Sequence, residues 1–81
     1  MTTLDLKYPI KTNGISTSTL TFKRPTAFDM SRAMQQQGDE VKRSVFLVSC
    51  LAGISMDDAW TLDFVDLNRC SEVIGSFLEQ K

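Results

Sequence analysis

The sequence predicts an α+β fold, an N-terminal β-hairpin followed by three or four α-helices, in a single small domain over residues 1–81. Two observations lead to this prediction. Apolar residues alternate with polar ones at the start of the chain, as in strands, and later recur at three- and four-residue spacing, as in helices. Pro25 lies where the period changes. It fixes its own backbone and pushes Arg24 into the extended region, so a strand ends there and a helix begins.

The first strand is expected to run from residue 3 to residue 8. Its apolar side chains alternate with polar ones and should face the helices together. Pro9 lacks the N–H that a strand ladder needs, so it is expected to end the strand. The apolar set consists of Leu4, Leu6 and Tyr8.

A tight turn and a second strand complete the hairpin, which is predicted over residues 3–24. Asn13-Gly14 supplies two residues that tolerate the positive φ of such a turn. Leu20 and Phe22 share one face of the second strand. Ile15 is an odd number of positions from Leu20, so in a regular strand its side chain would lie on the opposite face. This predicts either a β-bulge or a place for Ile15 in the turn. Because a two-stranded hairpin is marginal in water, it must pack on the helices or pair with another chain's strand.

The first helix is predicted over residues 26–37. Thr26 can cap it by accepting the backbone N–H of Asp29, whose negative charge suits the positive end of a helix. Gly38 ends it. Its apolar face is formed by Ala27, Met30, Ala33 and Met34.

The second helix is predicted over residues 39–52, with Asp39 as its cap. Its body, residues 45–52, is apolar nearly all round, which places it at the centre of the core. The valines in this segment leave a buried strand as the alternative. Gly53 follows and favours the helix.

Two further helices are predicted over residues 56–61 and 63–80. Ser55 with Asp58, and Asp63 with Asp66, have the spacing of capping boxes with Asp in place of Glu. Gly75 lies inside the last helix, where it costs about 1 kcal/mol relative to Ala unless close packing requires it. The expected apolar stripe of this helix is Phe64, Leu67, Cys70 or Ser71, Ile74, and Phe77 or Leu78.

The composition argues against an enzyme, a metal site and a cofactor. The chain has no histidine, and its two cysteines, Cys50 and Cys70, lie in apolar helical contexts where small buried side chains are expected. Four carboxylates are the only candidates for acid–base or metal chemistry, and helix capping accounts for them better. They are Asp57, Asp58, Asp63 and Asp66.

The charge is small in total and uneven in distribution. Residues 1–43 hold seven Lys/Arg against four Asp/Glu, whereas residues 44–81 hold two against six. Such poles could favour head-to-tail self-association or could be solvated faces that happen to differ. The start of the chain has no signal-peptide pattern, and no apolar run approaches the roughly 20 residues of a membrane span, so we expect a cytoplasmic protein without membrane contact.

Four apolar residues are candidate contacts with a protein partner: Met30, Met34, Trp60 and Phe77. Core packing is the favoured interpretation of the methionines and of the single tryptophan, because so small a core needs large apolar side chains inside. A DNA-binding or transcription-modulating protein is the alternative function, with phosphate contacts from Lys23, Arg24, Lys42 and Arg43. The second helix is apolar where a recognition helix should be polar, so nucleic acid is not expected as a partner.

Five segments, in order, carry a resemblance to a known family. They are Tyr8-Pro9-Ile10 with Gly14 five residues after Pro9, Leu20-Thr21-Phe22-Lys23-Arg24-Pro25-Thr26-Ala27-x-Asp29, Cys50-Leu51-Ala52-Gly53-Ile54-Ser55, Leu62-Asp63-x-x-Asp66 and Val73-Ile74-x-x-Phe77. Over nearly its full length the chain resembles the small tail assembly chaperones of contractile-tailed phages and Mu-like prophages. The motif residues Arg24, Pro25, Thr26 and Asp29 fall at the strand-to-helix junction, which indicates a structural role.

The resemblance implies a non-enzymatic role in virion assembly. Such chaperones bind the long tape measure protein in the host cytoplasm before the tail tube polymerises around it, and they are absent from the mature virion. A core too small to cover so much apolar surface, together with the opposite charge poles, leads us to expect a homo-oligomer of several copies on the tape measure protein, with the tail tube protein as a possible further partner. We expect the partner surfaces on the hairpin edge, the methionine face of the first helix and the last helix.

Overall fold

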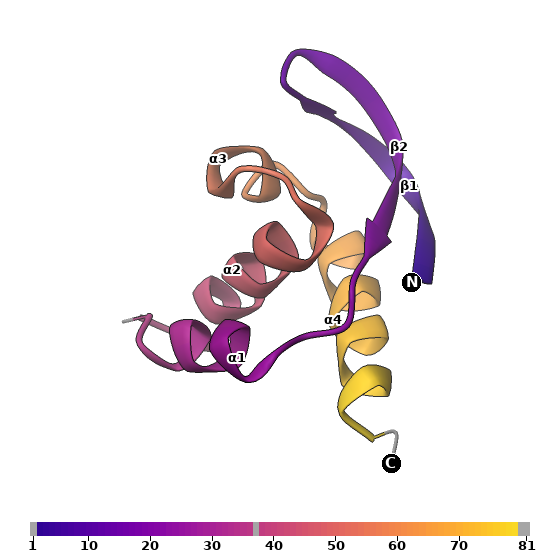
Figure 1. The fold of residues 1–81 in the computed structure, drawn as a ribbon. Helices are drawn as coiled ribbons and strands as arrows, with labels where there is room; N and C mark the ends of the chain where they lie inside the picture. Colours follow the sequence, from indigo (N-terminus) through magenta and orange to yellow (C-terminus); the bar gives the residue numbers. More distant parts are fainter. Residues whose placement is uncertain (1, 37, 80–81) are drawn as a thin grey trace.

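The computed structural model, which describes residues 2–36 and 38–79, has the predicted order of a hairpin followed by four helices (Figure 1). The hairpin lies across one side of the helices, and α1 and α3 lie on opposite sides of α2. The first and third helices are shorter than predicted: α1 ends at Met34 and α3 at Ala59, where the predicted ends were residues 37 and 61. Residue 37 and residue 80, the predicted end of the fourth helix, lie outside the described part of the chain, as does the side chain of Leu78. The elements are β1 (Thr2–Thr12), β2 (Ile15–Phe22), α1 (Ala27–Met34), α2 (Glu40–Ala52), α3 (Met56–Ala59) and α4 (Phe64–Glu79).

The turn of the hairpin forms where the sequence predicts it. Asn13 and Gly14 both have positive φ, 53° and 79°, as a two-residue turn between antiparallel strands requires. Ile15 is the first residue of β2, pairs with Thr12 and has an exposed side chain. Its position on the opposite face from Leu20 therefore directs it away from the helices.

The prediction that Pro9 ends the first strand is wrong. Strand β1 continues to Thr12, and its register shifts, so that residues 6–9 lie opposite Ser18 alone. Pro9 is tolerated because it lies in this bulge, where it does not have to donate a hydrogen bond to β2. The bulge also changes which side chains face inward: Tyr8 is exposed, and Ile10 is buried in its place.

Helix α2 is the centre of the fold, and the alternative of a buried strand is wrong. It packs against α1, α3, α4 and β2, and the hairpin side chains Leu20 and Phe22 are buried against the helices. Gly53, with a φ of 71°, ends α2 in the left-handed conformation. The core cluster consists of Leu6, Ile10, Leu20, Phe22, Val45, Val48, Leu51, Ala59, Leu67, Cys70, Ile74 and Phe77.

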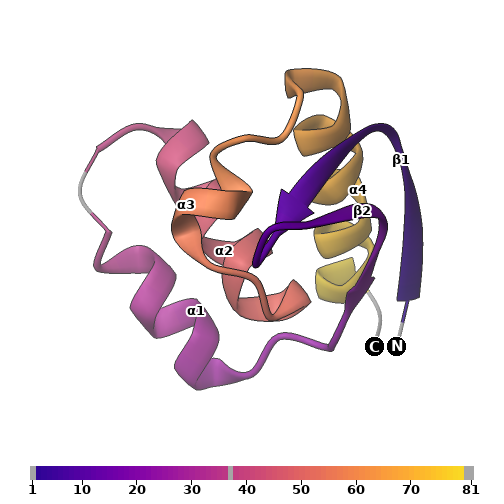
Figure 2. The same ribbon diagram turned by 90° about the horizontal axis from the view of Figure 1, so that it is seen from above.

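When the molecule is viewed from above, the hairpin lies beside α4 at one side of the molecule, and α1 lies at the other side (Figure 2). Strand β1 contacts α3 and α4, and β2 contacts α2, so the hairpin closes the core from one side. None of the described helices is long and apolar enough to cross a membrane.

Candidate functional site

The strand-to-helix junction is held by a reciprocal pair of hydrogen bonds. The backbone N–H of Asp29 donates to the Thr26 hydroxyl at 3.2 Å, and the Asp29 carboxylate accepts the backbone N–H of Thr26 at 3.1 Å. Lys23 Nζ lies 3.8 Å from the same carboxylate. The bond from Thr26 is the main reason that the pKa of Asp29 is held below its ordinary value, with the charges of Lys23 and Arg32 also contributing against the opposing effect of burial.

The residues beside this capping box connect the junction to the rest of the core. The backbone N–H of Lys23 donates to the carbonyl of Leu51 at 3.0 Å, which ties the end of β2 to α2. The guanidinium of Arg24 lies 5.8 Å from the ring centroid of Phe77 on α4, a cation–π contact. The motif at the junction thus contacts α2 and α4 and joins the hairpin to both.

Asp66 does not cap α4, and this expectation is wrong. Asp63 provides the cap by accepting the backbone N–H of Val65 at 3.0 Å. Asp66 is instead 0% exposed and accepts the backbone N–H groups of Lys7 and Tyr8 at 3.1 and 2.9 Å. Both donors lie in the bulge of β1, so a carboxylate from α4 takes the place of a strand partner.

The charge of Asp66 is stabilised where it is buried. Arg69 Nη1 donates to Asp66 Oδ1 at 3.1 Å, so the carboxylate has three donors around it. Burial raises the pKa of Asp66, but the N–H groups of Tyr8 and Lys7 and the guanidinium of Arg69 outweigh it and hold the pKa below its ordinary value. Burial and the nearby Asp66 charge also raise the pKa of the Cys70 thiol to about 11.

Asp58 has a second, weaker contact with the hairpin. Its backbone N–H donates to Ser55 Oγ at 3.1 Å, as the predicted cap requires. Its carboxylate does not reach back to complete a capping box and instead accepts the backbone N–H of Asn13 in the turn at 3.3 Å. Within residues 2–36 and 38–79, no three Asp, Glu or Cys side chains are grouped so that they could hold a metal ion.

The four predicted partner contacts lie in different environments. Met34 is 70% exposed and Trp60 is 48% exposed, so the core-packing interpretation is wrong for these two. Met30 is half-buried. Phe77 is only 7% exposed and belongs to the core cluster, so its ring has little surface to offer a partner.

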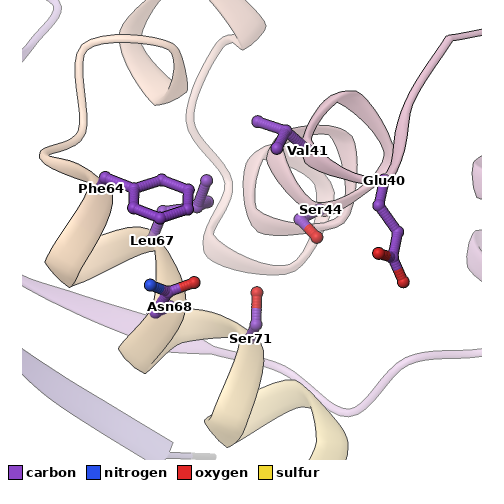
Figure 3. A pocket seen from close by; sticks show the side chains of 7 residues that line it. All are labelled: Glu40, Val41, Ser44, Phe64, Leu67, Asn68 and Ser71. Carbon is purple, nitrogen blue, oxygen red and sulfur yellow. The ribbon is translucent and has the colours of Figure 1, made fainter.

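A groove lies between α2 and α4 (Figure 3). It has a volume of about 290 Å³ and is lined by Glu40, Val41, Ser44, Phe64, Leu67, Asn68 and Ser71. A second hollow of about 160 Å³ shares Ser44 and Ser71 with it and extends it along both helices to Leu47, Ile74 and Gly75. Together we call these residues the α2–α4 groove.

Apolar side chains and small residues shape this groove. Phe64 was expected in the core stripe, but it is 61% exposed, and Figure 3 shows its ring facing Val41 across the opening. The side chains of Ser44 and Ser71 are short, so they leave the space between α2 and α4 open. A Cβ added at Gly75 would meet nothing within 4 Å, so the chain's own packing does not require glycine there.

Val41, Ser44 and Asn68 were not predicted as site residues. The feature of the sequence that could have indicated the groove is Gly75, because a glycine inside a helix is unfavourable unless packing or function requires it. The serines carry no such signal, because single serines are common on exposed helix faces.

The basic residues of the alternative function are partly engaged within the chain. Lys23 pairs with Asp29, and Arg24 covers Phe77. Lys42 and Arg43 lie in the first turn of α2, ahead of the buried segment of that helix. DNA binding by these residues stays the alternative that is not expected.

Comparison with known proteins gives one family. The family model described as "Phage tail assembly chaperone proteins, E, or 41 or 14" matches residues 3–79, which is nearly the whole chain. No curated protein and no solved structure matches the chain.

Proposed function

The chain belongs to the family of phage tail assembly chaperone proteins, and from this premise we propose that it binds the tape measure protein in the host cytoplasm before the tail tube forms. In this proposal the chain catalyses no reaction and leaves before the virion is complete. Several copies act on one tape measure protein, and the tail tube protein is a possible second partner.

The α2–α4 groove supports this proposal as the binding site. Amphipathic helices bind other proteins by laying an apolar face into a hydrophobic groove. Phe64 and Val41 offer exposed apolar surface at one end, and Leu47 and Ile74 line the other. The open space over Gly75 allows a partner backbone to approach closely.

The polar residues of the groove favour a helix over an extended strand as its occupant. They are the side chains of Glu40, Ser44, Asn68 and Ser71, and the backbone groups of α2 and α4 are already engaged in their own helices. An extended strand would find no free ladder of N–H and C=O groups to pair with. An apolar helical segment of the tape measure protein needs no free backbone groups, because its own hydrogen bonds are made within the helix.

A co-expression pull-down with the tape measure protein tests the proposal. Ser71→Phe fills the groove from its middle, whereas Ser76→Phe adds the same ring at an exposed position of the same helix. We expect the wild type and Ser76→Phe to retain the tape measure protein and Ser71→Phe to lose it, with unchanged circular dichroism. A wild-type chain that retains no tape measure protein would contradict the function. Equal retention by Ser71→Phe would contradict the groove as its site.

A further inference from the structure

Glu40 gives the α2–α4 groove a negative charge on its α2 wall. Of the described residues that line the groove, it alone is charged. Figure 3 shows its carboxylate on the opposite side of the groove from the Phe64 ring. Glu40 is exposed, and it takes part in no salt bridge within the described part of the chain. Lys42 and Arg43 follow it on α2 but do not line the groove, so the charge of Glu40 is available to a bound partner.

The α4 wall carries a second carboxylate, that of Glu72. It follows Asn68 by four positions and precedes Gly75 by three, so it lies on the same side of α4 as these two lining residues. Glu72 is exposed, and among the residues that the structure describes it also forms no salt bridge. A carboxylate therefore stands beside the groove on each of its two walls.

The apolar part of the groove is about three helical turns long. Phe64 and Gly75 are eleven positions apart on α4, which is about 16 Å at the rise of an α-helix. Val41, Leu47 and Ile74 supply apolar surface along this length. A helix with apolar side chains at positions i, i+3 or i+4, and i+7 covers it. The residues that flank this apolar stripe then lie beside the two walls, one flank near Glu40 and the other near Glu72.

We propose that the occupant of the groove is an amphipathic helix whose apolar stripe is flanked by Lys or Arg on both sides. This inference rests on the proposed function and names the chemistry of the tape measure segment that binds. Opposite charges across an interface fix the register of the two surfaces. A helix with the same stripe and acidic flanks would place like charges beside Glu40 and Glu72, which disfavours it.

The aromatic ring at the opening favours basic flanks for a second reason. Phe64 is 61% exposed, and the face of such a ring attracts a cation. Lys and Arg also carry long alkyl stems that cover apolar surface while the charged end stays in water. Asp and Glu have shorter stems and no attraction to the face of the ring.

Two designed helical peptides serve as probes of this preference. Both have the same stripe of leucine and alanine over at least three helical turns, and they differ only in lysine or glutamate along the two flanks. Circular dichroism selects a pair of equal helicity, so that helix formation does not decide the comparison. Fluorescence anisotropy of the labelled peptides, titrated with the purified full chain, measures each dissociation constant.

Charge-reversal variants connect the preference to the groove. Glu40→Lys with Glu72→Lys reverses the charge on both walls. Asp5→Lys with Asp57→Lys makes the same change in net charge at two exposed positions outside the groove and is the matched control. Ser71→Phe fills the groove. Circular dichroism of each variant checks that it is folded.

We expect the wild type to bind the lysine peptide about tenfold more tightly than the glutamate peptide at low salt. Added salt should reduce this ratio. The control should keep the preference, the groove variant with Glu40→Lys and Glu72→Lys should reverse it, and Ser71→Phe should bind neither peptide. A wild type that binds neither peptide or binds both equally, or a preference that persists in the groove variant, would overturn the proposal.

The pull-down separates this inference from the proposed function. The control should retain the tape measure protein, and the groove variant with Glu40→Lys and Glu72→Lys should retain much less of it. If the wild type retains the tape measure protein and Ser71→Phe loses it, but the peptides bind equally, the function stands and the basic flanks fail. If the wild type prefers the lysine peptide and retains no tape measure protein, the chemistry of the groove stands and the proposed partner fails.

Discussion

The carboxylate of Asp66 accepts the backbone N–H of Tyr8 at 2.9 Å and so ties α4 to β1 across 58 positions of the sequence. Its other oxygen accepts the N–H of Lys7 at 3.1 Å. The bulge in β1 leaves these two donors without a partner in β2, and unpaired buried donors are costly. One carboxylate with two oxygens satisfies both, so the irregular strand and the buried charge depend on each other.

Replacing Asp66 with Asn should destabilise the chain strongly. An amide has a single acceptor oxygen, so its NH2 group faces either the Tyr8 N–H or both the Lys7 N–H and the Arg69 guanidinium. The negative charge that pairs with Arg69 is also lost, and the expected loss of stability is about 3 kcal/mol. Urea unfolding at neutral pH measures it. Asp57→Asn, at an exposed carboxylate on the neighbouring helix, is the control and should change the free energy of unfolding by less than about 0.5 kcal/mol. Equal stability of the two variants would show that Asp66 does not hold the bulge.

The free energy of unfolding should fall in acid. The folded state holds the pKa values of Asp66 and Asp29 below the ordinary 3.8, so between the folded and the ordinary values the unfolded chain binds more protons. The stabilisation is therefore complete above the ordinary pKa and is lost as the pH falls below about 4 toward the folded values. Urea unfolding at several pH values should show this decline for the wild type. A decline of the same steepness in Asp66→Asn would rule out Asp66 as its source.

The sequence predicted the features that depend on neighbouring residues. The turn at Asn13-Gly14 and the cap at Thr26 each need only a few adjacent side chains with known conformational preferences. The body of α2 is apolar nearly all round, so it must be buried whichever elements surround it. These local rules were sufficient for the order of the elements and for the corner between β2 and α1.

Features that depend on distant residues could not be predicted in this way. Asp63 and Asp66 have the spacing of a cap, and only the fold shows that Asp66 lies beside the bulge of β1. Phe64 and Trp60 fit an apolar pattern equally well whether the core or a partner covers them. The α2–α4 groove likewise depends on how two helices are spaced, which no local pattern of either helix specifies.

Thr26→Ala should lower stability without affecting the partner. The hydroxyl accepts the N–H of Asp29 at 3.2 Å, and loss of such a cap costs about 0.5 to 2 kcal/mol. Chemical denaturation measures the loss, with Ser31→Ala, at an exposed position of the same helix, as the control. Retention of the tape measure protein should be unchanged for both. If Thr26→Ala abolished retention of the tape measure protein at unchanged stability, the motif would contact the partner rather than stabilise the junction between β2 and α1.

Two glycines should respond to alanine in opposite directions. Gly75 lies inside α4, where an added Cβ meets nothing within 4 Å, so Gly75→Ala should stabilise the chain by about 1 kcal/mol. Gly53 has a φ of 71°, which alanine adopts with strain, so Gly53→Ala should destabilise it by about 1 kcal/mol. Thermal denaturation distinguishes the two.

The larger change Gly75→Leu then separates packing within the chain from contact with a partner. The same open space accepts the leucine, so the fold should tolerate it, whereas the side chain occupies the part of the groove where a partner helix would approach. We expect a folded chain that retains less tape measure protein, while Gly75→Ala retains it nearly as well as the wild type. A loss of stability in both variants would mean that the glycine serves the chain's own packing, and the open groove would then lose its main support as a binding surface.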